Sequence, residues 1–225
     1  MARIDALFNA DQRSSVAKAV AAAEHKTAAE IVPVVAAASG RYDRAEDVAG
    51  LWLGLILMVL VWWVYPLPVT EPGGWGGRPA ILQLICMIAA VKVGFLAGAY
   101  ITAKTSPLRR LFTPAVQMRE EVEAKARAVF FDNRVHHTAA GSGILIYVSL
   151  FEHMATVLAD QATLEKLGAP AVQAICDELT SKLKAGDITA ALCSTIALAG
   201  DKLGAVLPRL ADDVNELADA LVVIE

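Results

Sequence analysis

Two long apolar blocks interrupt a chain that is otherwise a mixture of apolar and polar positions. The first block covers residues 48–69 and has no charged residue, and the second covers residues 79–101 and has only Lys92. Each block is about as long as a helix that crosses the ~30 Å hydrocarbon core of a bilayer. The stretch between them, residues 71–78, contains a proline and four glycines, which break helices and favour a turn. The pattern predicts a transmembrane helical hairpin over residues 48–101.

Basic residues gather at one end of this hairpin. Just before the first block lie Arg41 and Arg44, and just after the second block lie Lys104, Arg109 and Arg110. The connecting turn has only Arg78. Because Lys and Arg accumulate on the cytoplasmic side of membrane proteins, we expect both termini in the cytoplasm and the turn outside a bacterial inner membrane. Lys92 lies past the middle of the second block, so its long side chain can reach the cytoplasmic headgroups. The alternative is a role in transport or proton transfer, since a charge within a membrane segment often marks function.

Each apolar block carries a pair of glycines at helical spacing. Gly50 and Gly54 form a GxxxG motif in the first block, and Gly94 and Gly98 form one in the second. This spacing places both glycines on one face of a helix, where a neighbouring backbone can approach closely. Packing of the hairpin on itself, homodimerisation through one face, and chance occurrence in glycine-rich membrane helices are all compatible with the pattern.

The segment before the hairpin, residues 1–47, predicts one helix and one strand. Asn9 and Gln12 have the spacing of a capping box, so a helix should begin there and end near residue 25. Residues 30–36 form a continuous apolar run, which is typical of a strand buried on both faces. Pro33 lacks a backbone donor, so we expect this strand to lie at a sheet edge or to contain a bulge.

The segment after the hairpin, residues 102–225, predicts the remaining elements. Thr113 and Pro114 can start a helix whose apolar stripe is Val116, Val122, Ala126, Val129 and Phe130. Residues 143–150 and 155–159 form two strands joined by a turn, and two helices follow, the second capped by Asp187. The structure of residues 215–225 is not determined by their pattern.

The segment before the hairpin cannot form a core alone, because one helix and one strand bury too little apolar surface. The two segments should therefore make one α/β domain, with a small sheet and helices on both faces, into which the hairpin is inserted. The composition agrees with an inserted membrane hairpin, since apolar residues make up 56% of the chain, which is high for a soluble protein. The net charge of −4 argues against a nucleic-acid partner. Three cysteines without a CxxC pair indicate a reducing compartment, and the first residues lack the pattern of a signal peptide.

Four stretches of the sequence resemble the TPM domain family, which is often described as TPM phosphatase. They are residues 20–36, 39–47 (SGRYDRAED), 135–159 (VHHTAAGSGILIYVSLFEHMATVLA) and 215–224 (NELADALVVI). More narrowly, the chain resembles bacterial membrane proteins in which a transmembrane hairpin interrupts this domain. The resemblance implies a Rossmann-like α/β/α sandwich. It also implies that acid phosphatase activity, calcium binding, or assistance in the assembly of membrane complexes are functions to test.

The loop after the first strand offers candidate chemistry. Arg41 and Arg44 can pair with a phosphate group, and Asp43 can act as a nucleophile or a metal ligand. The same arginines can instead contact anionic lipid headgroups beside the membrane. The first interpretation predicts a hydrolase of phosphate monoesters.

Other polar residues are weaker candidates. His136 and His137 are candidates for acid–base catalysis or metal binding. They are adjacent, so in an extended segment they point in opposite directions and cannot readily share one metal ion. Glu152 and His153 lie in the turn between the two later strands, where a surface position is expected. Asp160 can cap a helix or, like Asp43 and Glu152, bind calcium or another divalent cation. No GxSxG, HExxH or Walker motif is present.

Two functions follow from these observations. The first is a membrane-anchored interaction or assembly factor at the cytoplasmic face, which binds a membrane-protein partner or a second copy of itself. The second is a phosphate monoester hydrolase that uses Asp43, Arg41 and Arg44.

Overall fold

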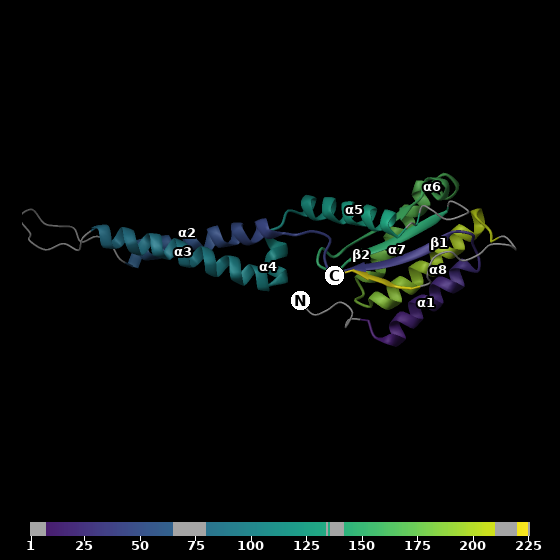
Figure 1. Ribbon diagram of the computed structural model, residues 1–225, viewed down its shortest axis with the longest axis horizontal. Helices are drawn as coiled ribbons and strands as arrows, with labels where there is room; N and C mark the ends of the chain where they lie inside the picture. The colour runs from purple at the N-terminus through teal and green to yellow at the C-terminus, as the bar shows by residue number, and fades with distance from the viewer. Residues whose placement is uncertain (1–7, 65–79, 134, 136–141, 210–219, 225) are drawn as a thin grey trace, which may run out of the picture. The chain divides into compact units, whose positions relative to one another are not determined.

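The computed structural model describes residues 8–64, 80–133, 135, 142–209 and 220–224. The chain divides into two compact units. The first, the α/β unit, consists of residues 1–40 and 118–225, and the second, the hairpin unit, consists of residues 41–117. Figure 1 labels the helices and the strands β1 and β2 as they are named below.

The α/β unit is built on a four-stranded sheet. Its strands are β1 (Glu30–Ala36), β2 (Gly143–Ser149), β3 (Met154–Ala159) and β4 (Val222–Ile224), in the order β3-β2-β1-β4. β1 is parallel to β2 and β4, whereas β2 and β3 are antiparallel. The expected strands at residues 30–36, 143–150 and 155–159 are confirmed, and the C-terminal segment supplies a short fourth strand.

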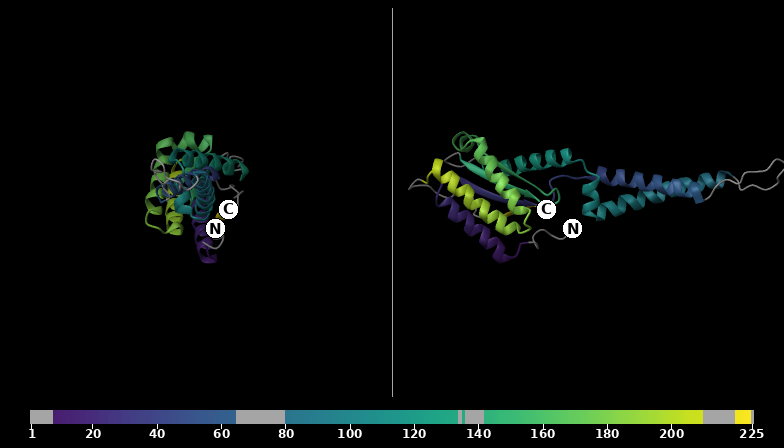
Figure 2. Two further views of the ribbon diagram at one scale, coloured as in Figure 1. Left: turned by 90° about the vertical axis from the view of Figure 1, so that its left-hand side faces the viewer. Right: turned by 180° about the vertical axis from the view of Figure 1, so that it is seen from behind.

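Helices cover both faces of this sheet, as Figures 1 and 2 show. One core cluster joins the sheet to α1 (Ala10–Glu24), α7 (Ala169–Leu183) and α8 (Ile188–Val206). The other joins it to α5 (Ala115–Asp132). Asn9 and Gln12 form the expected capping box of α1, and Asp187 caps α8. The expected α/β fold with helices on both faces is therefore confirmed.

β1 lies inside the sheet, so the expectation of an edge strand or a bulge at Pro33 was wrong. β1 pairs with β2 without interruption, and Pro33 lies opposite Ile146. The Glu30 amide donates towards β2, to the Ser142 carbonyl, so the Ile31 amide points to the other side, where it donates to Glu24. Pro33 faces that same side because the direction alternates along a strand. β4 begins only opposite Val34, so no strand there requires the donor that proline lacks.

Three further details differ from the sequence-based expectations. Val116, placed on the apolar stripe of α5, is 69% exposed, and Met118 takes a buried position instead. Two short helices, α4 (Ser106–Leu111) and α6 (Gln161–Leu167), were not anticipated. Both are less than two turns long, which is too short for a helical repeat of apolar residues to appear.

The hairpin unit contains α2 (Asp43–Val64) and α3 (Ala80–Lys104), which pack against each other. These helices of 22 and 25 residues are about 33 and 37 Å long at 1.5 Å per residue. Both are long and apolar enough to cross a membrane. The expected turn at residues 71–78 lies outside the described residues.

Candidate functional site

The carboxyl ends of β1 and β2 meet at one edge of the sheet, where open α/β folds usually bind ligands. β2 ends in Tyr147, Val148 and Ser149, and its two polar side chains share one face because side chains alternate along a strand. Leu150 and Phe151 then donate backbone hydrogen bonds of 2.9 Å to the carbonyls of residues 36 and 37. The turn after β2 is thereby folded against the loop after β1.

Glu152 is the centre of a buried polar cluster at this edge. Its side chain is fully buried, so the expected surface position was wrong for this residue, although His153 beside it is exposed. Its Oε1 accepts hydrogen bonds from the backbone amides of Ser39 (2.8 Å) and Gly40 (3.4 Å). Its Oε2 accepts a hydrogen bond from the Ser149 hydroxyl. One carboxylate therefore links the loop after β1 to the end of β2.

Ser39 and Tyr147 complete the cluster. The Ser39 hydroxyl lies 2.9 Å from the Tyr147 hydroxyl and donates to the Ser149 hydroxyl at 2.9 Å. Burial raises the pKa of Tyr147, the hydrogen bond with Ser39 lowers it, and the negative charge of Glu152 raises it again, with a net upward shift. The phenol is therefore held in its protonated form. We call Ser39, Tyr147, Ser149 and Glu152 the Glu152 cluster.

The raised pKa of Tyr147 makes an alkaline loss of stability a testable consequence. In the unfolded chain the tyrosine loses its proton near pH 10, and in the folded protein it does so at a higher pH. The protonated phenol therefore contributes its full stabilisation below about pH 10, and this contribution is lost as the pH rises towards the folded-state pKa. Tyr147→Phe should cost about 1 kcal/mol at neutral pH, because a part-buried hydrogen bond is lost, but should flatten the alkaline decline. Thermal unfolding at several pH values measures this. Tyr100→Phe is the control. If the difference in stability between the wild type and Tyr147→Phe stays constant between about pH 9 and 11, the prediction is contradicted.

None of the other predicted site residues that the structure describes is part of the Glu152 cluster. Asp160 caps α6 by accepting from the Thr163 amide at 2.6 Å, and it also accepts from the Gly143 amide at 2.7 Å. Arg41, Asp43 and Arg44 belong to the hairpin unit and are exposed, with Asp43 at the first turn of α2. His136 and His137 lie outside the described residues.

The chemistry of the Glu152 cluster is that of a satisfied network. Among the residues that the structure describes, no three His, Cys, Asp or Glu side chains gather as a metal site would require. Ser39, Tyr147 and Ser149 were not singled out in the sequence. The available signal was the pair of hydroxyl residues at alternate positions of a strand that is otherwise apolar.

The fold was compared with solved structures. The NMR structure of the BA42 protein from the psychrophilic bacterium Bizionia argentinensis matches with a TM-score of 0.58, over 99% of both chains and at 15% sequence identity. The fold is TPM-domain-like. At this identity the likeness concerns the fold alone. No protein-family model and no curated protein matches the sequence.

A second constellation lies between the two helices that interrupt the TPM-like fold. A Cβ atom added to Gly94 would lie 2.6 Å from the Gly54 Cα, and one added to Gly98 would lie 2.8 Å from the Gly50 Cα. The two GxxxG pairs therefore face each other across the hairpin, and we call these four residues the glycine seam. Because each glycine meets backbone atoms of the other helix, no larger residue fits without moving the helices apart.

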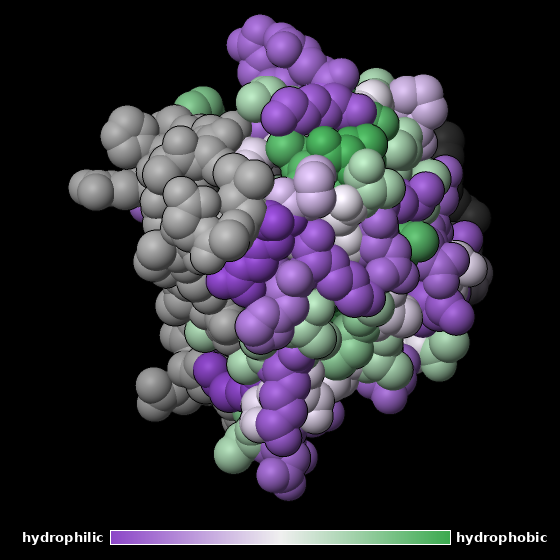
Figure 3. All heavy atoms as spheres, turned by 90° about the vertical axis from the view of Figure 1, so that its right-hand side faces the viewer, coloured by the Kyte–Doolittle hydropathy of each residue, from purple (hydrophilic) through white to green (hydrophobic). Residues whose placement is uncertain are grey.

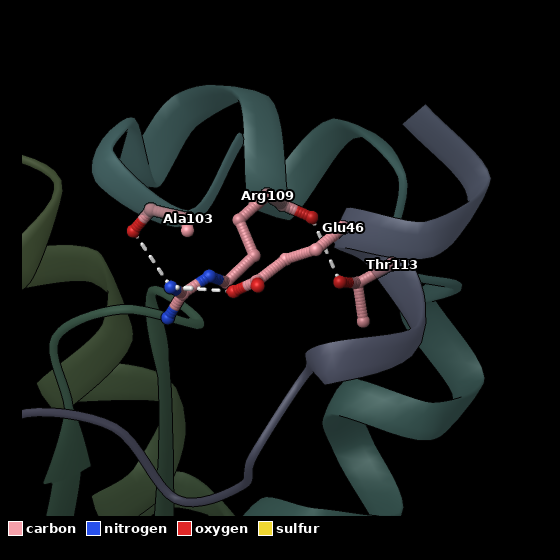
Figure 4. Close-up of polar contacts among 4 residues, drawn as sticks. All are labelled: Glu46, Ala103, Arg109 and Thr113. Carbon is pink, nitrogen blue, oxygen red and sulfur yellow. Dashed lines mark hydrogen bonds and ion pairs between the residues drawn. The ribbon is translucent and has the colours of Figure 1, made fainter. Parts of the chain in front are cut away.

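The base of the hairpin is closed by an ion pair, drawn in Figure 4. Arg109 of α4 lies 2.9 Å from the Glu46 carboxylate of α2, with the two side chains 19% and 23% exposed. The same guanidinium donates to the Ala103 carbonyl at 2.8 Å, and the Thr113 hydroxyl donates to the Arg109 carbonyl at 2.8 Å. These bonds fix α4 against the ends of α2 and α3.

Proposed function

We propose that this chain is a membrane-anchored TPM-like protein whose α/β unit binds a partner protein at the cytoplasmic face of the inner membrane. The main support for the membrane anchor is that the two apolar helices of the hairpin are mostly exposed. In the apolar 18-residue window of each helix, only 17% is buried in α2 and only 11% in α3. A helix that is apolar all round needs an apolar environment, and the described residues of the chain bury only this small share of the two helices.

The exposed residues of the hairpin support a bilayer as that environment. Large apolar side chains project along both helices, from Leu51 to Val64 and from Ile81 to Ile101, and Trp63 is 74% exposed. The α/β unit differs, since the face drawn in Figure 3 is mostly hydrophilic with small separate apolar groups. Lipid also explains the glycine seam, because close backbone packing holds helices together where water supplies no hydrophobic driving force.

The Glu152 cluster supports a binding role over phosphate hydrolysis. The Ser39 and Gly40 amides are the donors that could hold a phosphate at the carboxyl edge of the sheet. Both already donate to Glu152, whose negative charge also opposes a second anion there. A hydrolase would have to use the exposed Arg41, Asp43 and Arg44 without these amides.

The anchor and its orientation are tested by labelling introduced cysteines in intact cells. In a background of Cys86→Ala, Cys176→Ala and Cys193→Ala, a cysteine at position 74 should react with an impermeant maleimide, and one at position 225 should react only after lysis. The protein should also resist extraction by alkaline carbonate. Labelling at 225 alone would overturn the orientation, and release by carbonate would overturn the anchor.

Partner binding is tested by purification of the full chain from gently solubilised membranes. A specific partner should be recovered with the wild type and with Glu165→Ala, which changes an exposed helix position, but not with Glu152→Ala, which breaks the Glu152 cluster. If every variant recovers the same proteins, or none, the partner role of the α/β unit is rejected. Turnover of a generic phosphoester that is lost in Asp43→Asn would favour the hydrolase instead.

A further inference from the structure

We propose that α4 and its flanking residues form a second, surface contact with the membrane, which binds anionic lipid headgroups beside the point where the hairpin enters. We call residues 104–116 the interface segment. The inference rests on the membrane anchor proposed above and adds to it the part of the chain that lies on the bilayer surface and the lipid chemistry that it selects.

The position of the interface segment follows from contacts within the hairpin unit. α3 ends at Lys104, and α4 begins at Ser106 and packs against both α2 and α3. The Arg109–Glu46 ion pair holds α4 level with the first turns of α2, one helical turn before Gly50. Apolar residues predominate in α2 from Val48 onward, so α4 lies where the apolar surface of the hairpin ends. This is the depth of the headgroups if the hairpin spans the bilayer.

The interface segment exposes large apolar side chains. Leu111 is 75% exposed and Val116 is 69% exposed, although both belong to helices. On α3, Tyr100 and Ile101 are also exposed, at 66% and 48%, so the apolar surface continues towards the interface segment. The Lys104 ammonium lies 6.0 Å from the centre of the Tyr100 ring. Tyrosine and lysine are characteristic of the membrane–water boundary.

The charges left at this end of the hairpin unit are mainly positive. Arg109 and Glu46 neutralise each other. The remaining cations are Arg41, Arg44, Lys104 and Arg110, against the carboxylates of Asp43 and Asp47. Both carboxylates lie near the N-terminus of α2, where the helix dipole favours negative charge. Apolar side chains beside this excess of positive charge match a surface of anionic lipids, for which each basic residue strengthens binding by about fivefold.

The depth of the interface segment can be measured by electron paramagnetic resonance of the full chain in phosphatidylcholine vesicles with phosphatidylglycerol. In the cysteine-free background, nitroxides are placed at positions 59, 111 and 164, where Val59, Leu111 and Leu164 are exposed in α2, α4 and α6. The label at 59 should lie in hydrocarbon, the label at 111 on the order of 5 Å below the headgroups, and the label at 164 in water.

The outcomes separate the inference from the anchor on which it rests. If the label at 59 lies in hydrocarbon but the label at 111 is in water, the interface segment is rejected and the anchor stands. If the label at 59 is itself in water, the anchor fails. Both proposals are supported only if the label at 59 reaches hydrocarbon and the label at 111 lies just below the headgroups.

The lipid chemistry is tested by spin-labelled phosphatidylglycerol and phosphatidylcholine competing for the protein surface. Wild type should prefer phosphatidylglycerol, and replacing Arg41, Arg44, Lys104 and Arg110 with glutamine should reduce the preference by about fivefold for each charge removed. The control carries the same number of changes at exposed cations of the α/β unit, namely Arg127, Lys166, Lys182 and Lys184. An equal preference in wild type and the interface variant would overturn the proposal.

Discussion

Glu152→Ala should lower the free energy of unfolding of the α/β unit by about 3–5 kcal/mol, because it leaves buried donors without acceptors. The two backbone amides of Ser39 and Gly40 and the Ser149 hydroxyl all donate to this carboxylate. Because those amides lie in the loop after β1, the change should also loosen that loop locally. Denaturant unfolding in detergent measures the global effect, and hydrogen exchange of the Ser39 and Gly40 amides, faster by about a hundredfold or more, measures the local one.

Two companion variants make this result specific. Glu152→Gln keeps a carbonyl acceptor without the charge, so it should cost about half as much. Glu165→Ala changes an exposed glutamate of α6 and should lie within about 0.5 kcal/mol of wild type. Normal exchange at Ser39 and Gly40 in Glu152→Ala would mean that the Glu152 cluster does not hold the loop.

Gly94→Ile should separate the two hairpin helices, since the new side chain would meet the Gly54 backbone and not a side chain that can turn away. Overpacking of this kind costs about 3 kcal/mol when the obstructing atoms cannot move alone. Helices that pack through larger residues lie roughly 2 Å further apart than glycine-mediated pairs. Distances between spin labels at positions 51 and 101, both exposed near the same end of the hairpin, report this separation.

Ala89→Ile is the matched control, because it introduces the same side chain at an exposed position of α3. It should leave the label distance unchanged. A dimer that is lost in Gly94→Ile while the distance within the hairpin stays the same would assign the glycine seam to contact between two copies. An unchanged distance and an unchanged oligomer size would leave the glycines without a packing role.

The features that could be predicted from the sequence are those with a local pattern. The apolar blocks, the capping box at Asn9 and the run over residues 30–36 each contain their own periodicity or cap, so α2, α3, α1 and β1 were expected close to their observed places. The place of β1 within the sheet was missed. The effect of Pro33 depends on where β4 begins, and β4 is a three-residue strand almost two hundred residues further along the chain.

The Glu152 cluster could not be predicted for a related reason. Glu152 and His153 are adjacent polar residues in a turn, and turns are usually at the surface. The burial of Glu152 depends on amide donors from residue 39, which is more than a hundred positions away. Similarly, the Arg109–Glu46 pair joins residues on either side of the hairpin, so arginines that indicated topology in the sequence include one that holds α4 in place.

The pairing of β1 with β2 has a consequence for biosynthesis. The two strands are direct neighbours, yet the whole hairpin is translated between them. A ribosome that has finished β1 must still produce more than a hundred residues before the partner strand emerges. During this interval α1 and β1 lack the strand β2 with which β1 pairs, although the hairpin is already complete. If the hairpin is the proposed membrane anchor, targeting to the membrane precedes completion of the sheet, and the nascent N-terminal segment would need protection until β2 is made.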